Sequence, residues 1–186
     1  AVGSGINADK NFAKYFAQEM TNIYDKKTRF TASKNFYHEL SAQDCSVQLS
    51  GELKNLAIIL MKISNDLRWM NSGPLTGLSE IELKALQPGS SIMPGKVNPV
   101  IPEAVAMASA DVIGNDVSIT VAAQSGSFQL NVMLPVIAYN LLKSINLLSG
   151  AMNALSKNAI KSFKVNHKNL EISISKNPIL VTALNP

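Results

Sequence analysis

The sequence has few residues from which a disulfide framework or a metal site could be built. Cys45 is its only cysteine, and His38 and His167 are its only histidines. A lone cysteine forms no disulfide within the chain and no cysteine metal site, so we expect a reducing cytoplasmic or organelle-matrix setting. We interpret Cys45 as a small core residue on a helix, and both histidines as surface or capping residues.

Charged residues are also scarce. They make up 16% of the chain, against about a quarter in an average soluble domain. This low fraction indicates that much of the chain is buried, including against other subunits. The formal net charge of +4 comes from dispersed lysines, and no basic run is interleaved with aromatic residues. This pattern argues against a nucleic-acid partner.

Long apolar runs are missing as well. The run LAIIL at 56–60 is far short of the ~20 apolar residues that cross a bilayer as a helix. We therefore expect no membrane partner. The opening residues, AVGSGIN, lack the architecture of a signal peptide, and we interpret the chain as processed or as a fragment.

The sequence does contain strong helical periodicity. A first helix is predicted to run to about residue 26, capped by Asn7 or Asp9, with an apolar face formed by Phe12, Phe16, Met20 and Ile23. A long second helix is predicted from about 36 to 70. Its core stripe consists of Leu49, Leu53, Leu56, Leu60, Ile63 and Leu67. Gly51 interrupts this helix, which suggests close packing against a neighbour.

The second half of the chain repeats this helical pattern. Pro102 suits the first turn of a helix that ends at the break SGS, 125–127. Another helix is predicted from about 128 to 160, kinked at Pro135, and a short one after Asn166. No segment alternates apolar and polar residues over a useful length. The sequence therefore predicts an all-α fold, a bundle of three or four long helices that forms one domain over residues 1–186.

Between these halves, residues 71–101 read as a loop of about thirty residues, far longer than the usual connection of ~4–6 residues. Within it, QPGSSIMPGKVNPVIPE at 87–103 combines glycines with a lysine. The phosphate-loop pattern G-x-x-x-x-G-K-[ST] fails, because Ser90 stands at the first glycine position and Val97 at the final hydroxyl position. The hydroxyls, the cation, the amide and the glycine-exposed backbone suit a carboxylate as well as a phosphate.

The stretch GSSIMPGKVNPVIPE at 89–103 matches the signature G-S-S-x-M-P-x-K-x-N-x-x-x-x-E of the fumarase/aspartase superfamily at every specified position. The resemblance extends over the whole chain, through MKISNDLRWMNSGP, VIGNDVSITVAAQSGSFQLNVMLPVI and the ending LVTALNP. The chain most resembles class II fumarases, because of Gly95 and this ending. NPVIPE and QLNVMLPV lean towards aspartases, and argininosuccinate and adenylosuccinate lyases are less alike.

Two departures from the family accompany this resemblance. Leu75 follows the SGP turn where fumarases and aspartases usually have arginine. The family's enzymes are also well over twice as long. The resemblance implies that the chain is the later part of the central helical domain, without the N-terminal and C-terminal domains and without the histidine-bearing and Ser-Ser-Asn motif regions.

The resemblance implies a lyase that interconverts L-malate and fumarate plus water, without a metal or an organic cofactor. It assigns Ser90 as the catalytic base and Glu103 as a catalytic residue that orients a histidine from another chain. Ser91, Lys96 and Asn98 would bind the dicarboxylate substrate. The family's active sites lie where three subunits of a homotetramer meet, and the loop would close over the substrate.

Three alternatives stay open. An aspartate ammonia-lyase would share this loop, because the contacts that distinguish the two leaving groups come from the missing segments. A non-catalytic helical scaffold is a second alternative, although it has no need of Ser90, Lys96, Asn98 and Glu103 together. Nucleotide binding is the third, and it is disfavoured by the failed phosphate-loop pattern. The bacterial cytosol and the mitochondrial matrix are equally compatible with the sequence.

Overall fold

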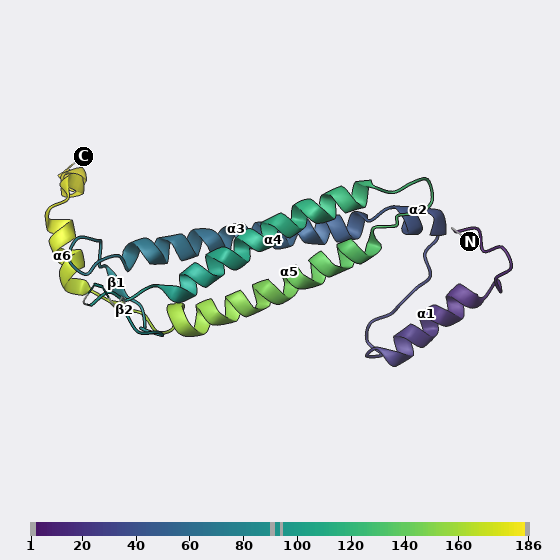
Figure 1. Ribbon diagram of the computed structural model, residues 1–186, viewed down its shortest axis with the longest axis horizontal. Coiled ribbons are helices and arrows are strands. Elements are labelled where there is room, and N and C mark those ends of the chain that lie inside the picture. The colour runs from purple at the N-terminus through teal and green to yellow at the C-terminus, as the bar shows by residue number, and fades with distance from the viewer. Residues whose placement is uncertain (1–2, 90–91, 94, 185–186) are drawn as a thin grey trace. The chain divides into compact units, whose positions relative to one another are not determined.

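The computed structural model describes residues 3–89, 92–93 and 95–184. The chain divides into two compact units, one formed by residues 1–50 and 117–141 and the other by residues 51–116 and 142–186. The regular secondary structure of the described residues is helical apart from one two-stranded ribbon and an isolated bridge, and loops and turns connect these elements (Figure 1). The prediction of an all-α fold is therefore confirmed.

The first unit begins with two helices, α1 (Phe12–Ile23) and α2 (Phe36–Ser41). Asn11 stands at the N-cap of α1 without a side-chain cap, while the Asp9 carboxylate accepts a hydrogen bond from the Asn11 amide at 2.7 Å. In α2, the Asn35 side chain accepts from the His38 amide at 3.2 Å, as a capping residue does. The predicted apolar face of α1 is not buried, because Phe12, Phe16 and Ile23 are exposed.

The helix predicted from 36 to 70 is two helices, because the chain breaks after α2 and starts again as α3 (Asp44–Met70). Ala42 has an extended conformation, with φ −88° and ψ 142°. The core stripe is partly right: Leu60 and Leu67 are buried, whereas Leu49 and Ile63 are exposed.

Two further predictions for α3 are wrong. Cys45 is exposed, because it lies in the first turn of this helix rather than in its packed part. A side chain at Gly51 would meet nothing within 4 Å, so this glycine marks no close helix contact in the described chain.

The break at SGS is where α4 (Val100–Gln124) ends, and α5 spans Leu134–Leu155. No kink occurs at Pro135, contrary to prediction, because α5 begins only one residue earlier. Residues 127–130 form a tight turn closed by the Ser127–Leu130 bridge, with Phe128 at a φ of +51°. Asn131 secures this turn: its side-chain amide donates to the carbonyls of Ala122 and Ala123, at 2.9 and 3.1 Å.

After α5, a π-helical turn spans Ser156–Ile160, and α6 (His167–Ser175) begins where predicted, with the Asn166 side chain at its N-cap. The chain ends in a 3₁₀ helix, Pro178–Leu184. Strand β2 (Lys164–Val165) precedes α6 and pairs antiparallel with β1 (Ile81–Glu82). This ribbon was not predicted, because two-residue strands are too short to show alternation.

The second unit has an apolar core between α3, α4 and α5, closed by the ribbon. Its buried members are Ala57, Leu60, Leu67, Ile81, Leu83, Val105, Val112, Leu148, Ala151, Leu155 and Ala159. The first unit has a smaller core of Ile119, Ala122 and Ile137. Because Ile81 and Leu83 belong to the larger core, the start of the loop between β1 and α4 is fixed by packing.

Polar side chains of different helices also pair inside the second unit. Asn115 Nδ2 donates to Ser144 Oγ at 3.1 Å, and both residues are buried.

By length and hydropathy, α4 is the one described helix that could cross a membrane, although the core helix of a protein outside the membrane passes the same test. This finding was not predicted, because polar residues such as Ser109 and Asp111 interrupt the apolar runs of α4.

Candidate active site

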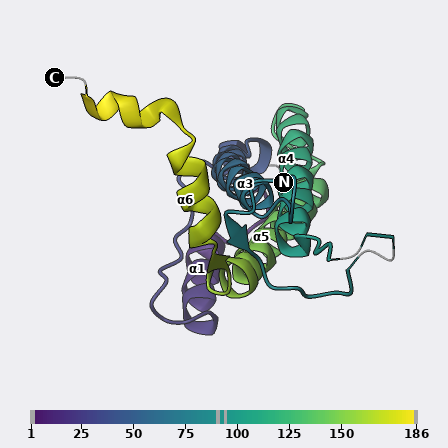
Figure 2. The ribbon, with the colours of Figure 1, turned by 90° about the vertical axis from the view of Figure 1, so that its left-hand side faces the viewer.

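The predicted site residues lie on the loop between β1 and α4 and on the first turn of α4. Ser90 and Ser91 lie outside the described residues. Lys96 is exposed, and Asn98 and Glu103 are half-buried. The loop extends away from the helices of its unit, as Figure 2 shows for its teal, described part.

The chain between α3 and α4 has an outgoing limb, residues 71–89, and a returning limb, residues 95–99. The two limbs meet at a neck formed by Gly89 and Lys96. A Cβ atom added to Gly89 would lie 2.4 Å from the Lys96 carbonyl oxygen. Real Cβ atoms do not approach a backbone oxygen so closely, so only glycine fits here without movement. The closure brings Gly89, the residue that precedes Ser90 in the sequence, beside Lys96.

The returning limb is ordered by its own backbone. Gly95 has a φ of +75°, which glycine adopts without strain. The Lys96 amide donates to the Met93 carbonyl at 3.3 Å, and the Val100 amide donates to the Asn98 carbonyl at 2.9 Å. Asn98 therefore lies two residues before the start of α4 and accepts a backbone hydrogen bond from its first residue.

The N-terminus of α4 supplies favourable electrostatics for an anion. The unpaired amide groups of a helix N-terminus carry a partial positive charge, which favours carboxylates and phosphates. Glu103 lies in this first turn, where its amide donates to the Pro99 carbonyl at 3.1 Å. A negative side chain at this position is stabilised by the same dipole.

The outgoing limb is fastened to the end of α3. The Glu80 amide donates to the Met70 carbonyl at 2.8 Å, and the Ser79 amide donates to the Ser72 carbonyl at 2.7 Å. Ser72 Oγ accepts from the Leu78 amide at 3.0 Å. Leu75, which replaces the family's usual arginine, lies in the turn so closed and is 93% exposed. Its side chain takes no part in the packing of the described chain.

The ribbon fastens the same limb to the segment before α6. In addition to the β1–β2 pairing, the Asn166 amide donates to the Glu80 carbonyl at 2.8 Å. The Asn169 side chain donates to the Ser79 carbonyl at 3.2 Å. The limb is thus held between two segments that are distant in sequence.

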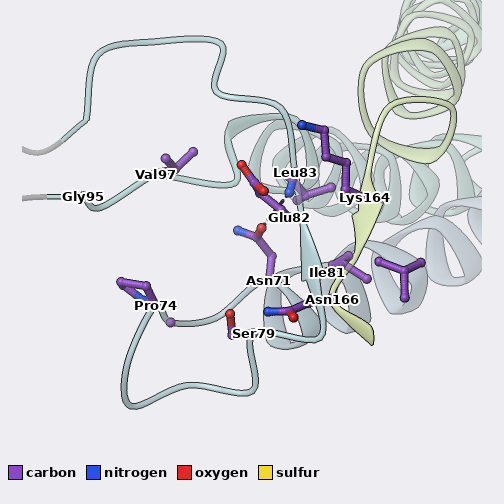
Figure 3. Close-up of a pocket in the computed structure, with 12 residues that line it drawn as sticks. Asn71, Pro74, Ser79, Ile81, Glu82, Leu83, Gly95, Val97, Lys164 and Asn166 are labelled. Carbon is purple, nitrogen blue, oxygen red and sulfur yellow. Dashed lines mark hydrogen bonds between the residues drawn. The ribbon is translucent and has the colours of Figure 1, made fainter. Parts of the chain in front are cut away.

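A cavity of about 510 Å³ lies behind the loop (Figure 3). Its lining comes from the SGP turn, the ribbon and the returning limb: Asn71, Gly73, Pro74, Ser79, Ile81, Glu82, Leu83, Gly95, Val97, Lys164, Val165 and Asn166. Sequence reasoning missed the polar members of this lining. No local pattern identifies them, because their proximity depends on the ribbon and on contacts between distant segments.

Neither histidine belongs to this loop. His38 is exposed, with Nε2 3.5 Å from Asp44 Oδ2, and His167 is exposed at the start of α6. Their interpretation as surface or capping residues is confirmed. Within residues 3–89, 92–93 and 95–184, no three His, Cys, Asp or Glu side chains are grouped closely enough to hold a metal ion.

Comparison with known proteins gives a consistent picture. The model of a family described as lyase matches residues 1–114 of the chain. The chain is 60% identical to a class II fumarate hydratase of Pseudomonas aeruginosa over all of its 186 residues, which are 40% of that relative. It is 54% identical to a class II fumarate hydratase of Xylella fastidiosa, of which it covers 39%. The chain thus spans about 40% of the length of these curated relatives.

Solved structures agree. A class II fumarase from Schistosoma mansoni is 35% identical, with a TM-score of 0.91 over 100% of this chain and 42% of that one. A protein described as fumarate lyase:delta crystallin from Brucella melitensis, bound to cobalt, is 42% identical, with a TM-score of 0.92 over 99% of this chain and 40% of that one. The chain belongs to the lyase family, as a member of the fumarase/aspartase superfamily that is most similar to class II fumarate hydratases.

Proposed function

We propose that the complete protein to which this chain belongs interconverts L-malate and fumarate plus water. The observation that carries the proposal is the neck between Gly89 and Lys96, which closes the superfamily's signature loop immediately before the positive end of α4. The 60% identity to a class II fumarate hydratase supports the same reaction. The chain would contribute one of the segments that surround the substrate.

The difficult step is the removal of a proton from the carbon beside a carboxylate, because a hydrogen on this carbon is only very weakly acidic. The electrons left behind form an aci-carboxylate dianion, and the hydroxyl on the neighbouring carbon then leaves with a proton as water. We assign Ser90 as the base that takes the carbon-bound proton, acting as an alkoxide. Backbone amide groups of a glycine-rich loop stabilise such an oxyanion.

Lys96 and Asn98 are assigned to the reacting carboxylate, together with Ser91. A cation and an amide donor gain strength as this carboxylate takes on a second negative charge, so they stabilise the transition state more than the substrate. The exposure of Lys96 suits a group that must reach a ligand. Glu103 is assigned to orient a histidine supplied by another chain and to balance its charge. The proposed mechanism uses neither a metal nor an organic cofactor.

A homotetramer with active sites shared between subunits is part of the proposal. The second unit exposes Ile58, Ile59 and Met107, and large apolar residues on long helices mark surfaces that another chain covers. A groove of about 510 Å³ between α4 and α5 is lined largely by alanine and glycine, so a further helix could approach closely there. We place the protein in the cytoplasm, or in the mitochondrial matrix of a eukaryote.

The test follows fumarate absorbance after L-malate or L-aspartate is added to the complete protein. We expect fumarate from malate alone, and loss of that activity in Ser90→Ala. The segment 1–186 by itself is expected to form an oligomeric helical bundle without turnover, because the other motif regions are missing. If that segment alone dehydrated malate, the proposal that the active site also needs the other motif regions would be wrong.

The remaining outcomes separate the alternatives. Fumarate from aspartate alone would identify an aspartate ammonia-lyase, and would mean that Gly95 and the LVTALNP ending had misled the assignment. No product from either substrate would favour another lyase of the superfamily or a non-catalytic scaffold. A rise in melting temperature with nucleotide would reopen the phosphate-loop reading.

A further inference from the structure

The signature loop, which connects β1 to α4, starts at Leu83. A side chain twelve residues earlier in the sequence binds the backbone of Leu83. Asn71, directly after α3, accepts a hydrogen bond through Oδ1 from the Leu83 amide at 2.8 Å. Figure 3 shows this bond as a dashed line at the base of the loop. No motif places an asparagine here for this purpose, and the signature residues are not involved.

Leu83 is the last buried residue along the outgoing limb. Its side chain is 5% exposed and belongs to the core of the second unit. Beyond it, every described side chain from Lys84 to Val97 is exposed. Packing therefore fixes the limb up to Leu83, and the hydrogen bond from its amide to Asn71 is the last described tie before the Gly89–Lys96 neck.

Asn71 also lines the cavity behind the loop, whose opposite wall consists of Gly95 and Val97 on the returning limb. These two residues flank Lys96. In Figure 3 the side chains of Asn71 and Glu82 face into this space. Among the described residues, Asn71 Nδ2 has no hydrogen-bond partner, so Oδ1 makes the one side-chain bond of this residue.

At the neck the backbone of the outgoing limb lies close against Lys96, so we expect a displacement of this limb to disturb Lys96 as well. We propose that Asn71 is a positioning residue of the active site, which holds the Leu83 amide and so sets the place of Lys96 relative to α4. The inference rests on the proposed function, since Lys96 is assigned there to the substrate carboxylate. Asn71 itself does not touch the substrate in this proposal.

Replacement of Asn71 by alanine leaves the half-buried Leu83 amide without its acceptor. The loss of one such bond corresponds to about a tenfold change in the population of the ordered limb. Asn71→Asp keeps an oxygen at the same position, and an ionised acceptor bonds an amide at least as well. The two variants therefore separate the acceptor from the rest of the side chain.

The experiment uses the complete protein in four forms: wild type, Asn71→Ala, Asn71→Asp and Asn65→Ala. Asn65 is the matched control, an exposed asparagine of α3 whose Oδ1 accepts from Arg68 Nη1 at 3.2 Å. For each form we would measure kcat and KM for L-malate, the melting temperature, and amide hydrogen exchange of the peptide spanning 80–89.

We expect Asn71→Ala to reduce kcat/KM about tenfold, with faster exchange in 80–89 and a melting temperature close to that of wild type. Asn71→Asp should restore both kcat/KM and slow exchange, and Asn65→Ala should match wild type. Wild-type turnover in Asn71→Ala, equal losses in Asn71→Ala and Asn71→Asp, or a loss explained by a lower melting temperature would each overturn the inference.

The failure of the proposed function is distinguishable from the failure of this inference. If wild type forms no fumarate from malate, the proposed function is wrong, and the exchange of 80–89 alone then decides whether Asn71 orders the limb. If wild type is active and exchange in 80–89 is the same in Asn71→Ala, only the role of Asn71 is wrong.

Discussion

Lys54 Nζ lies 2.6 Å from Asp116 Oδ2, so that α3 and α4 are joined by an ion pair inside the second unit. Its two ends differ in environment: the Asp116 side chain is 8% exposed and the Lys54 side chain is 41% exposed. A second pair, between Lys143 and Asp111 at 2.8 Å, joins α5 to α4 with both side chains more than a third exposed. Because both carboxylates belong to α4, the two ion pairs allow a test of how burial changes the contribution of an ion pair to stability.

We predict that Lys54→Met lowers the free energy of unfolding more than Lys143→Met. Removal of the cation beside a buried carboxylate costs up to ~3–5 kcal/mol, and the partial exposure of Lys54 reduces this to about 1–3 kcal/mol. For the exposed pair we expect less than ~1 kcal/mol. Urea denaturation of the two variants, followed by helical circular dichroism, measures the difference.

The double variant Lys54→Met/Asp116→Leu is the control for this comparison. It removes the buried carboxylate together with its cation, so it should recover most of the stability lost in the single variant. An equal loss in Lys54→Met and Lys143→Met would show that the burial of Asp116 has no energetic consequence.

Two buried serines lead to the opposite prediction, namely that their substitution does not lower the stability of the fold. Ser64 and Ser109 are fully buried in the second unit, and neither hydroxyl oxygen has a hydrogen-bond partner in the part of the chain that the structure describes. A buried hydroxyl without a partner costs about 1–3 kcal/mol of desolvation. Ser64→Ala and Ser109→Ala should therefore leave the urea midpoint unchanged or raise it.

Ser144→Ala is the contrasting variant, since Ser144 Oγ accepts the hydrogen bond from buried Asn115. Its loss should lower stability by about 1 kcal/mol or more, because the Asn115 amide is left without this acceptor. If Ser64→Ala or Ser109→Ala destabilised the protein as much as Ser144→Ala, the two hydroxyls would have partners in the complete protein.

Helical periodicity predicted where most helices lie but not what covers them. Leu60 and Leu49 belong to the same apolar stripe, yet only Leu60 is buried. Periodicity identifies the residues that share a face, and it carries no information about the partner that packs there. The exposed part of the stripe agrees with the proposed tetramer, in which other subunits would cover it.

Helix boundaries failed where a distant contact decided them. Pro135 was expected to kink a helix that had started at about 128, but the chain is held in a turn until α5 begins. The Asn131 amide donates to the Leu40 carbonyl at 3.0 Å, and its side chain binds the end of α4. Neither partner is near Pro135 in sequence, so no local pattern predicts this start.

The signature loop shows the same division. Its residues are recognisable from the sequence, because their spacing is fixed along one segment. The tie between Asn71 and Leu83 and the ribbon between β1 and β2 join separate segments, and only the fold brings them together. The sequence therefore suffices to name the residues that the proposal assigns to the substrate, whereas it does not reveal those that hold their loop.

The turn at Asp25 should respond to acid. Hydrogen bonds from the Thr28 amide, opposed by desolvation and assisted by the Lys27 amide, lower the pKa of the Asp25 carboxyl below its usual value of 3.8. A carboxyl whose pKa is lower in the folded state stabilises the fold above pH 3.8, and this contribution is lost as the pH falls through the folded pKa.

We therefore expect the Thr28 amide signal to shift as the pH falls, with a midpoint below 3.8, and the exchange of this amide with solvent to accelerate over the same transition. Titration by nuclear magnetic resonance of segment 1–186, which we expect to fold by itself, would measure both. In Asp25→Asn the transition should disappear, because the amide carries no titrating proton. A midpoint above 3.8 in wild type would contradict the direction of the pKa shift.

The neck of the signature loop gives the most direct test of the site. Gly89→Ala would force a Cβ atom against the Lys96 carbonyl oxygen, 2.4 Å away without movement, so the backbone at Lys96 must shift. A displacement of about 1 Å in a group that holds the substrate reduces catalysis on the order of a hundredfold. We expect this loss in kcat/KM for L-malate, with little change in melting temperature.

Gly51→Ala is the matched control, because a Cβ atom there meets nothing within 4 Å and the residue lies inside α3. Alanine in a helix interior is more stable than glycine by about 0.5–1 kcal/mol, so this variant should be slightly more stable and fully active. If Gly89→Ala retained wild-type kcat/KM, the closeness of Gly89 and Lys96 would be irrelevant to turnover. The proposed function would then lose the observation on which it rests, even if malate were converted.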